Sequence, residues 1–123
     1  GCQAEGGSAA AMAAAALVTL KGGTLTQATS AASLALQSML GLICDPVAAR
    51  VEVPCLGKNI IAASNAFSCA NIALAGYDQV IPFDEVVDAA RRWLESKHRG
   101  ANACDPAKRR GSARRQRPSS RRS

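Results

Sequence analysis

The sequence predicts an all-α fold of about four helices, with an irregular, proline-containing cysteine loop and a disordered basic tail. Three observations lead to this prediction. Apolar residues recur at helical spacing in four stretches of residues 1–98. Prolines and two cysteines, Cys44 and Cys55, stand together between the second and third stretches. Residues 99–123 are rich in arginine and serine and show no apolar periodicity, which is typical of disordered segments.

A glycine-rich stop separates the first two predicted helices. The stretch EGGSAAAMAAAALVTL is dominated by alanine, which has the highest helix propensity, and Lys21-Gly22-Gly23 follows it. Thr24 opens the second helix, and Gln27 three residues later completes a capping-box pattern. The residues of this helix that fall near helical spacing are Leu25, Ala28, Ala32, Leu36 and Met39, and Gly41 ends the run.

The cysteine loop is predicted to be irregular. Asp45-Pro46 cannot continue a helix, because proline lacks an N–H and disfavours α geometry in the residue before it. The alternation in RVEVP predicts a short extended piece, which Pro54 ends just before Cys55. Helical spacing returns in residues 56–76, where Gly76 is the expected cap and the spacing is carried by Ile60, Ala63, Phe67, Asn71 and Leu74.

The fourth predicted helix is the most clearly amphipathic. In IPFDEVVDAARRWLESKHR, Pro82 suits the first helical turn, and Asp84 and Glu85 suit the positive start of the helix. One apolar face is formed by Phe83, Val86, Val87, Ala90, Trp93 and Leu94. We therefore divide the chain into a helical domain, residues 1–98, and an Arg/Ser-rich tail, residues 99–123.

Composition narrows the class of protein. Residues 1–98 carry 6 Lys/Arg and 8 Asp/Glu, a net charge of −2, whereas residues 99–123 carry 9 Lys/Arg and one acid, a net charge of +8. Five cysteines among long apolar helices favour a reduced, cytoplasmic protein over a secreted disulfide scaffold. The apolar run 9–20 is too short to span a bilayer and lacks the basic flank of an export signal. The short chain, which opens on Gly1-Cys2 without an initiator Met, is interpreted as a fragment.

Three cysteines are candidate metal ligands: Cys2, Cys44 and Cys55. Cys2 and Cys55 are expected just before helix N-termini, whose positive field lowers a thiol pKa. Three thiolates around a four-iron cluster leave one iron open, as catalytic metals require. The spacing alone matches no common zinc pattern. Inert buried thiols and a disulfide between Cys44 and Cys55 remain alternatives on the residues alone.

The other candidate residues favour simpler interpretations. Cys69, inside AFSCANIAL, is predicted to be an ordinary buried thiol. His98, between Lys97 and Arg99, is predicted to be solvated rather than a catalytic base. Cys104 stands at the edge of the basic tail and receives no role.

Five motifs in order carry a family likeness: GCQAE, GSAAAMAAAALVTLKGGT, LGLICDPVAARVEVPC, KN and ALAGYDQVIPFDEVVDA. From Gly1 to about Ala90 the chain resembles the C-terminal part of the α chain of iron–sulfur-dependent L-serine dehydratase. This chain differs from the family pattern at three places. It has Ala49-Arg50 where relatives tend to have a glycine, and Gly6 is an unusual residue at its position. After Ala90 it lacks the Gly-rich ending of the family.

The resemblance implies that the chain is a fragment of a larger catalytic domain and that Cys2, Cys44 and Cys55 hold a [4Fe–4S] cluster. It also implies dehydration of L-serine to pyruvate and ammonia, with the open iron acting as a Lewis acid on the substrate hydroxyl. Lys58 would add positive charge beside the cluster and the substrate carboxylate, although a solvated Lys58 fits the sequence equally well. The general base is unassigned. A missing N-terminal portion or β chain is the expected partner, with oligomerisation when the enzyme is complete and no activity for this part alone.

Two alternatives stay open from the sequence. A non-catalytic helical remnant could keep the motifs without holding a cluster. Its basic tail could associate with nucleic acid through charge alone, but the tail has no aromatic residue for stacking and follows no recognisable DNA-binding motif. Nucleic acid and membranes are therefore not among the expected partners.

Overall fold

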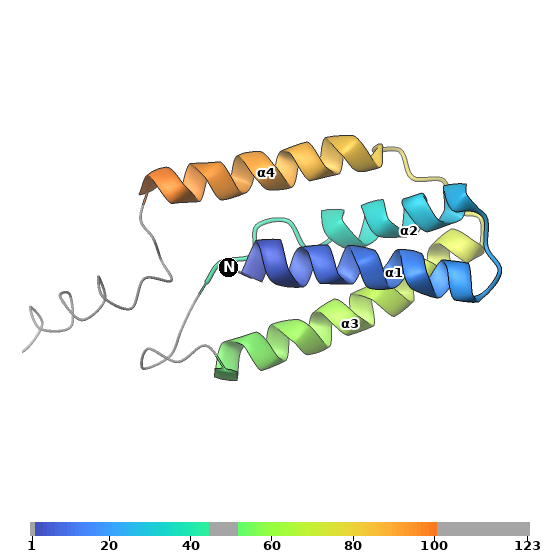
Figure 1. Ribbon diagram of the computed structural model, residues 1–123, viewed down its shortest axis with the longest axis horizontal. Helices are drawn as coiled ribbons and strands as arrows, with labels where there is room; N and C mark the ends of the chain where they lie inside the picture. The colour runs from blue at the N-terminus through green and yellow to red at the C-terminus, as the bar shows by residue number, and fades with distance from the viewer. Residues whose placement is uncertain (1, 45–51, 101–123) are drawn as a thin grey trace, which may run out of the picture.

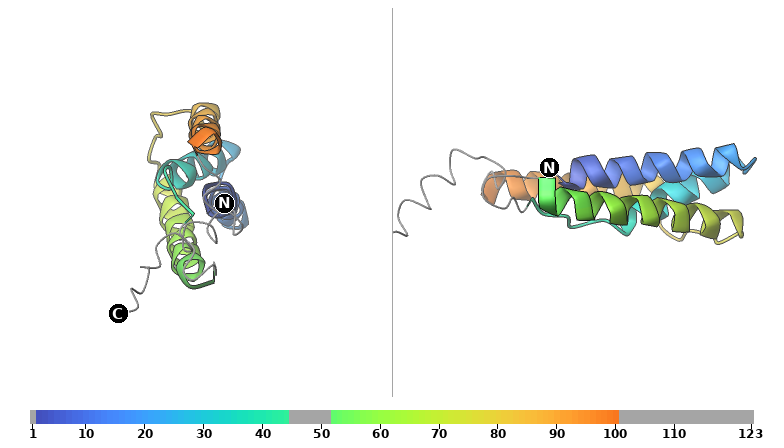
Figure 2. Two further views of the ribbon diagram at one scale, coloured as in Figure 1. Left: turned by 90° about the vertical axis from the view of Figure 1, so that its left-hand side faces the viewer. Right: turned by 90° about the horizontal axis from the view of Figure 1, so that it is seen from below.

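The computed structural model describes residues 2–44 and 52–100, and within them the fold is all-α with four α-helices and no strand. The elements are η1 (Gln3–Gly7), α1 (Ser8–Leu20), α2 (Leu25–Gln37), α3 (Glu52–Leu74) and α4 (Phe83–Gly100). Helices α1, α2 and α3 pack together as a bundle, and α4 lies on the other side of the α1–α2 pair from α3 (Figure 1, Figure 2). This confirms the predicted fold class.

The first helix begins with a π-helical turn, η1, which runs without a break into α1. Cys2 and Ser8, the residues that flank η1, both have right-handed helical backbone angles. Cys2 therefore lies at the start of one continuous helix. Gly7 lies in this turn, and a Cβ at Gly7 would lie 2.8 Å from Nε2 of Gln3. The wider π turn and the missing side chain therefore make room for the Gln3 carboxamide. Single π turns often occur at functional sites.

The turn between α1 and α2 confirms the capping prediction in detail. Thr24 Oγ1 accepts a hydrogen bond from the Gln27 amide at 3.2 Å, and Gln27 Oε1 accepts one from the Thr24 amide at 2.9 Å. Gly22 has a φ of +75°, which an L side chain rarely adopts. The two helices are thus joined by a short, fully hydrogen-bonded connection.

The core of the bundle is built mainly from alanine. Small side chains let helix axes approach closely, so that backbone and Cβ atoms supply most of the packing. The buried set is Ala10, Ala14, Val18, Ala28, Ala31, Ala35, Met39, Ala62, Ala66, Cys69, Ala70 and Ala73. Leu25, which the sequence placed with the apolar residues of α2, is instead 81% exposed.

Helix α3 departs from the sequence prediction at its start. Glu52 and Val53 were expected to be extended and Pro54 to end that extended piece, but α3 begins at Glu52. Pro54 lies in the first turn, where its missing N–H has no helical acceptor to lose, so it starts the helix instead of breaking the chain. Cys55 consequently lies within the first turn of α3, and not before it. Arg50 and Val51 lie outside the described residues.

The buried side of α3 also differs from the side that the sequence indicated. Ile60 and Phe67 carry the helical spacing but are 59% and 58% exposed. The buried stripe consists of Ala62, Ala66, Cys69, Ala70 and Ala73. The spacing correctly predicted a helix, but the alanines pack against α1 and α2 because they allow closer contact than the large residues do. Gly76, with a φ of +86°, follows the helix as predicted.

Helix α4 packs through the face that the sequence predicted. Val86 and Ala90 are buried with residues of α1 and α2, while Phe83 and Leu94 are half-buried. The hydroxyl of Ser33 on α2 donates to the carbonyl of Ile81 at 3.0 Å and fixes the segment before α4. The disordered tail was predicted to begin at Arg99, but Arg99 and Gly100 belong to α4. The rest of the predicted tail, residues 101–123 with Cys104, lies outside the described part of the chain.

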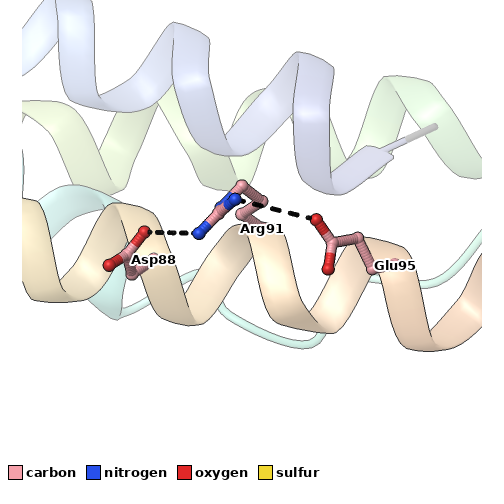
Figure 3. A network of polar contacts seen from close by, with 3 residues as sticks. All are labelled: Asp88, Arg91 and Glu95. Carbon is pink, nitrogen blue, oxygen red and sulfur yellow. Dashed lines mark hydrogen bonds and ion pairs between the residues drawn. The ribbon is translucent and has the colours of Figure 1, made fainter.

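Helix α4 carries an exposed ion-pair network beside an apolar cavity, and Arg91 belongs to both. Arg91 pairs with Asp88 at 3.2 Å and with Glu95 at 4.0 Å (Figure 3). These side chains are more than half exposed, so each pair contributes at most about 1 kcal/mol. An apolar cavity of about 610 Å³ separates part of α4 from α1 and α2 and is lined by residues such as Met12 and Val87. None of the described helices combines the length and the apolarity needed to cross a membrane.

Candidate metal centre

Two of the three predicted ligands meet at one end of the bundle. Cys2 caps η1 and is 7% exposed, and Cys55 lies in the first turn of α3 and is half-buried. Their side chains are hydrogen-bonded to each other. The parallel packing of α1 and α3 starts both helices at the same end, and this brings together thiols that are far apart in the sequence (Figure 1).

Lys58 connects these thiols to the segment that leads to Cys44. It lies three residues after Cys55 in α3, and so on the same side of the helix. Its Nζ donates to the carbonyl of Ile43 at 2.7 Å and lies 3.7 Å from Sγ of Cys2. Lys58 is half-buried at the candidate site.

The third predicted ligand, Cys44, is half-buried and directly follows Ile43. Cys44 is disulfide-bonded, whereas Cys2, Cys55 and Cys69 are free. Within residues 2–44 and 52–100, no three Cys, His, Asp or Glu side chains form a group that could hold a metal ion. The described residues thus bring two thiols and one ammonium group together, with the chain leading to the third cysteine beside them.

A polar side chain that the sequence reading missed lies beside this group. Gln3 is 2% exposed, and its Oε1 accepts hydrogen bonds from the amides of Gly41 and Leu42 at 2.7 and 3.1 Å. Among residues 2–44 and 52–100, its buried Nε2 has no hydrogen-bond partner. The sequence signal was a glutamine next to a candidate ligand and directly before an alanine-rich helix that buries few polar groups.

The pKa of the Cys55 thiol runs against the sequence expectation. A helix N-terminus was expected to lower it, but the pKa of Cys55 is raised. Partial burial is the main cause, and the hydrogen bond to Cys2 and the charges on Cys2 and Glu5 act in the same direction. Lys58 is the group that lowers it. In the metal-free chain Cys55 therefore favours the protonated thiol.

Of the two remaining candidates, Cys69 lies near the C-terminal end of α3, away from Cys55. Cys69 is buried in the bundle core, as predicted for an ordinary thiol, and burial raises its pKa. Its Sγ contacts Asn65 Oδ1 at 3.4 Å within α3. His98 belongs to α4, but its side chain lies outside the described ones.

Known proteins share both the sequence and the motif order. Residues 1–106 match the family model described as serine dehydratase alpha chain. The chain is 57% identical over 89 residues to a probable L-serine dehydratase, alpha chain, of Bacillus subtilis and 56% identical over 89 residues to the L-serine dehydratase, alpha chain, of Peptoniphilus asaccharolyticus. Each match covers 72% of this chain and 30% of the relative. An L-serine dehydratase of Mycobacterium tuberculosis is 47% identical over 100 residues, which are 80% of this chain and 22% of that protein.

Proposed function

Because the chain belongs to the serine dehydratase alpha-chain family, we propose that residues 1–98 are the cluster-binding part of an L-serine dehydratase. The complete enzyme converts L-serine to pyruvate and ammonia in the cytoplasm. The chain spans 30% of the length of the Bacillus subtilis and Peptoniphilus asaccharolyticus α chains. The rest of the substrate site therefore belongs to the remaining part of the α chain or to a β chain, and the chain alone is inactive.

The contact among Cys2, Cys55 and Lys58 carries this proposal. Two thiols in hydrogen-bond contact are the ligand type that iron–sulfur clusters use. An ammonium group 3.7 Å from one of the sulfurs offsets the negative charge of a thiolate-bound cluster. Glu5 acts in the opposite sense, since its charge raises the pKa of Cys55. The donor set therefore fits an anionic sulfur-ligated group better than a hard cation.

Three thiolates, from Cys2, Cys44 and Cys55, would hold a [4Fe–4S] cluster. When bound, it supplies a Lewis acid for the serine hydroxyl. The residues of this chain hold the thiolates, and Lys58 fixes Ile43, the neighbour of Cys44, through its carbonyl. A disulfide sulfur has no thiolate to donate, so Cys44 must be reduced before the cluster binds. We assign no general base to this chain.

Anaerobic reconstitution tests the cluster. The reduced chain is incubated with iron and sulfide, and bound iron, acid-labile sulfide, visible absorbance and EPR are measured. We expect about four irons per chain. Cys44→Ser should lose most of them, whereas Cys69→Ser, which changes a buried thiol outside the site, should keep them. Equal iron in all three proteins, or none in the wild type, contradicts the proposal.

A chimaera tests the activity. The matching 89-residue stretch of the Bacillus subtilis α chain is replaced by this chain's sequence and expressed with the rest of that enzyme. We expect pyruvate formation from L-serine that is lost in the Cys2→Ser version of the chimaera. A chimaera that binds the cluster but makes no pyruvate would separate cluster binding from catalysis and overturn the assigned reaction.

A further inference from the structure

Gln3 joins two segments that carry proposed cluster ligands. Gln3 directly follows Cys2. Its Oε1 accepts hydrogen bonds from the amides of Gly41 and Leu42, which lie shortly before Cys44 in the sequence. Gly41 has a φ of +95°, so the chain takes an unusual turn where it meets the glutamine. One buried oxygen thus links the Cys2 segment to the Cys44 segment across 38 and 39 residues of sequence.

We propose that Gln3 is a positioning residue, which sets the place of the Cys44 segment relative to Cys2 through these two hydrogen bonds. The inference rests on the proposed cluster, but the hydrogen bonds exist in the metal-free chain. Gln3 and Lys58 hold the same short segment from two sides, since Lys58 Nζ binds the carbonyl of Ile43, the residue after Leu42. Residues 41–43 are therefore held by a side chain from η1 and another from α3.

The chemistry of the site explains why glutamine fits this role. Two amide hydrogens converge on one point, and only an oxygen acceptor satisfies both. The side chain must also reach across from η1, and Gly7 leaves the space that the carboxamide occupies. The buried Nε2 has no partner within the described part of the chain, which costs stability, so glutamine is a poor choice for packing alone. Its benefit lies in the acceptor oxygen.

The test compares three variants. Gln3→Met keeps the length of the side chain and removes the acceptor, whereas Gln3→Glu keeps acceptor oxygens. Gln37→Met makes the same change at an exposed glutamine of α2 and is the control. Two quantities are measured: hydrogen exchange of the Gly41 and Leu42 amides in the metal-free chain, and iron bound after anaerobic reconstitution.

We expect Gln3→Met to speed exchange at Gly41 and Leu42 by about tenfold, as loss of a hydrogen bond does. It should also lower bound iron to less than half of the wild-type amount, with little change in Tm because the orphaned Nε2 disappears too. Gln3→Glu should restore slow exchange, and Gln37→Met should match the wild type. Unchanged exchange and unchanged iron in Gln3→Met overturn the inference, as does an equal loss in Gln37→Met.

The two measurements separate this inference from the proposed function. If the wild type takes up no iron, the cluster proposal fails. Faster exchange confined to Gly41 and Leu42 in Gln3→Met then still supports the positioning role, and unchanged exchange overturns it. If the wild type takes up iron and only a general fall in Tm accompanies its loss in Gln3→Met, the residue is structural and the inference is wrong.

Discussion

The two ends of the three-helix bundle are held by different parts of the chain. At the turn end, where residues 21–24 join α1 to α2 beside Leu74, backbone groups and a capping box supply the contacts. At the cysteine end, where Cys2, Cys55 and residues 41–44 meet, the long side chains of Gln3 and Lys58 supply them. The two partners of the capping box lie three residues apart, whereas Gln3 and Lys58 bind groups that lie 15 to 56 residues away in the sequence. The turn end is therefore specified mainly by neighbouring residues, and the cysteine end by residues that only the fold brings together.

The largest effect on the free energy of unfolding is expected from adding a side chain at Gly23, in the tightly packed turn end. A Cβ at Gly23 would lie 2.4 Å from Cγ1 of Val18 and 2.9 Å from Cδ2 of Leu74, so both packed side chains would have to move. We expect Gly23→Ala to lower the free energy of unfolding by about 2–3 kcal/mol in urea denaturation.

Gly57, in α3 at the cysteine end, is the matched control. A Cβ there meets no atom within 4 Å. Gly57→Ala should raise the free energy of unfolding by about 0.5–1 kcal/mol, because alanine favours the helix. Equal losses in both variants would show that the turn end is not the tightly packed one.

A smaller effect follows from removing the cap. Thr24→Ala deletes the oxygen that accepts the Gln27 amide and should cost about 1 kcal/mol. Thr26→Ala changes an exposed threonine of the same helix turn and should be neutral or slightly stabilising. Urea denaturation of both variants measures the difference in their free energies of unfolding. Similar values for the two would show that the capping box does not stabilise the turn end.

At the cysteine end, Lys58→Met should change chemistry more than stability. We expect a loss of about 0.5–1 kcal/mol for the hydrogen bond to Ile43. The pKa of Cys55 should rise further, because Lys58 is the charge that lowers it. Iodoacetamide should therefore label Cys55 more slowly at about pH 8, since the thiolate is the reacting form.

The control for Lys58 lies at the other end of the bundle. Lys21→Met makes the same change at an exposed lysine of the turn end. Mass spectrometry of the labelled peptides follows both variants over time. Equal or faster labelling of Cys55 in Lys58→Met would mean that the ammonium group does not act on this thiol.

The smallest expected effect is a pH dependence of the free energy of unfolding, which comes from Cys69 in the core between the two ends. Burial holds the pKa of Cys69 above 9.0, the ordinary value, so the unfolded thiol loses its proton first as the pH rises. Above that pH the unfolded state binds fewer protons, and stability falls by at most about 1.4 kcal/mol per pH unit for this group. Cys69→Ala should flatten the alkaline part of a curve of unfolding free energy against pH. Identical curves for the two proteins would contradict this.

Local signals in the sequence predicted much of the fold. The capping box at Thr24 and Gln27 and the glycine after α3 depend only on neighbouring residues, and both are confirmed. The apolar face of α4 also follows from the sequence, because large residues dominate it.

Predictions that depend on long-range packing were less successful. The buried side of α3 was missed, since Ile60 and Phe67 outweigh the alanines in a periodicity although the alanines make the close contacts. Pro54 was interpreted as a breaker because the sequence does not show on which side of it the helix begins.

The candidate site was predicted in part. The position of Cys2 at a helix start follows from the sequence, and the contact between Cys2 and Cys55 depends on the parallel packing of α1 and α3. The part played by Gln3 could not be predicted, because its partners are backbone amides 38 and 39 residues away. The raised pKa of Cys55 depends in the same way on groups that only the fold brings near.

The contacts at the two ends join residues at different separations in the sequence, and this determines which end of the bundle can form first during synthesis. The turn end closes over residues 21–24, so the α1–α2 hairpin can form early during synthesis. The cysteine end needs Lys58, which lies 56 residues after Cys2, and so it cannot form until the start of α3 has left the ribosome. Until then Cys2 lies on the α1–α2 hairpin without the thiol of Cys55 beside it. If the chain holds the proposed cluster, the cluster can bind only after the start of α3 has been synthesised.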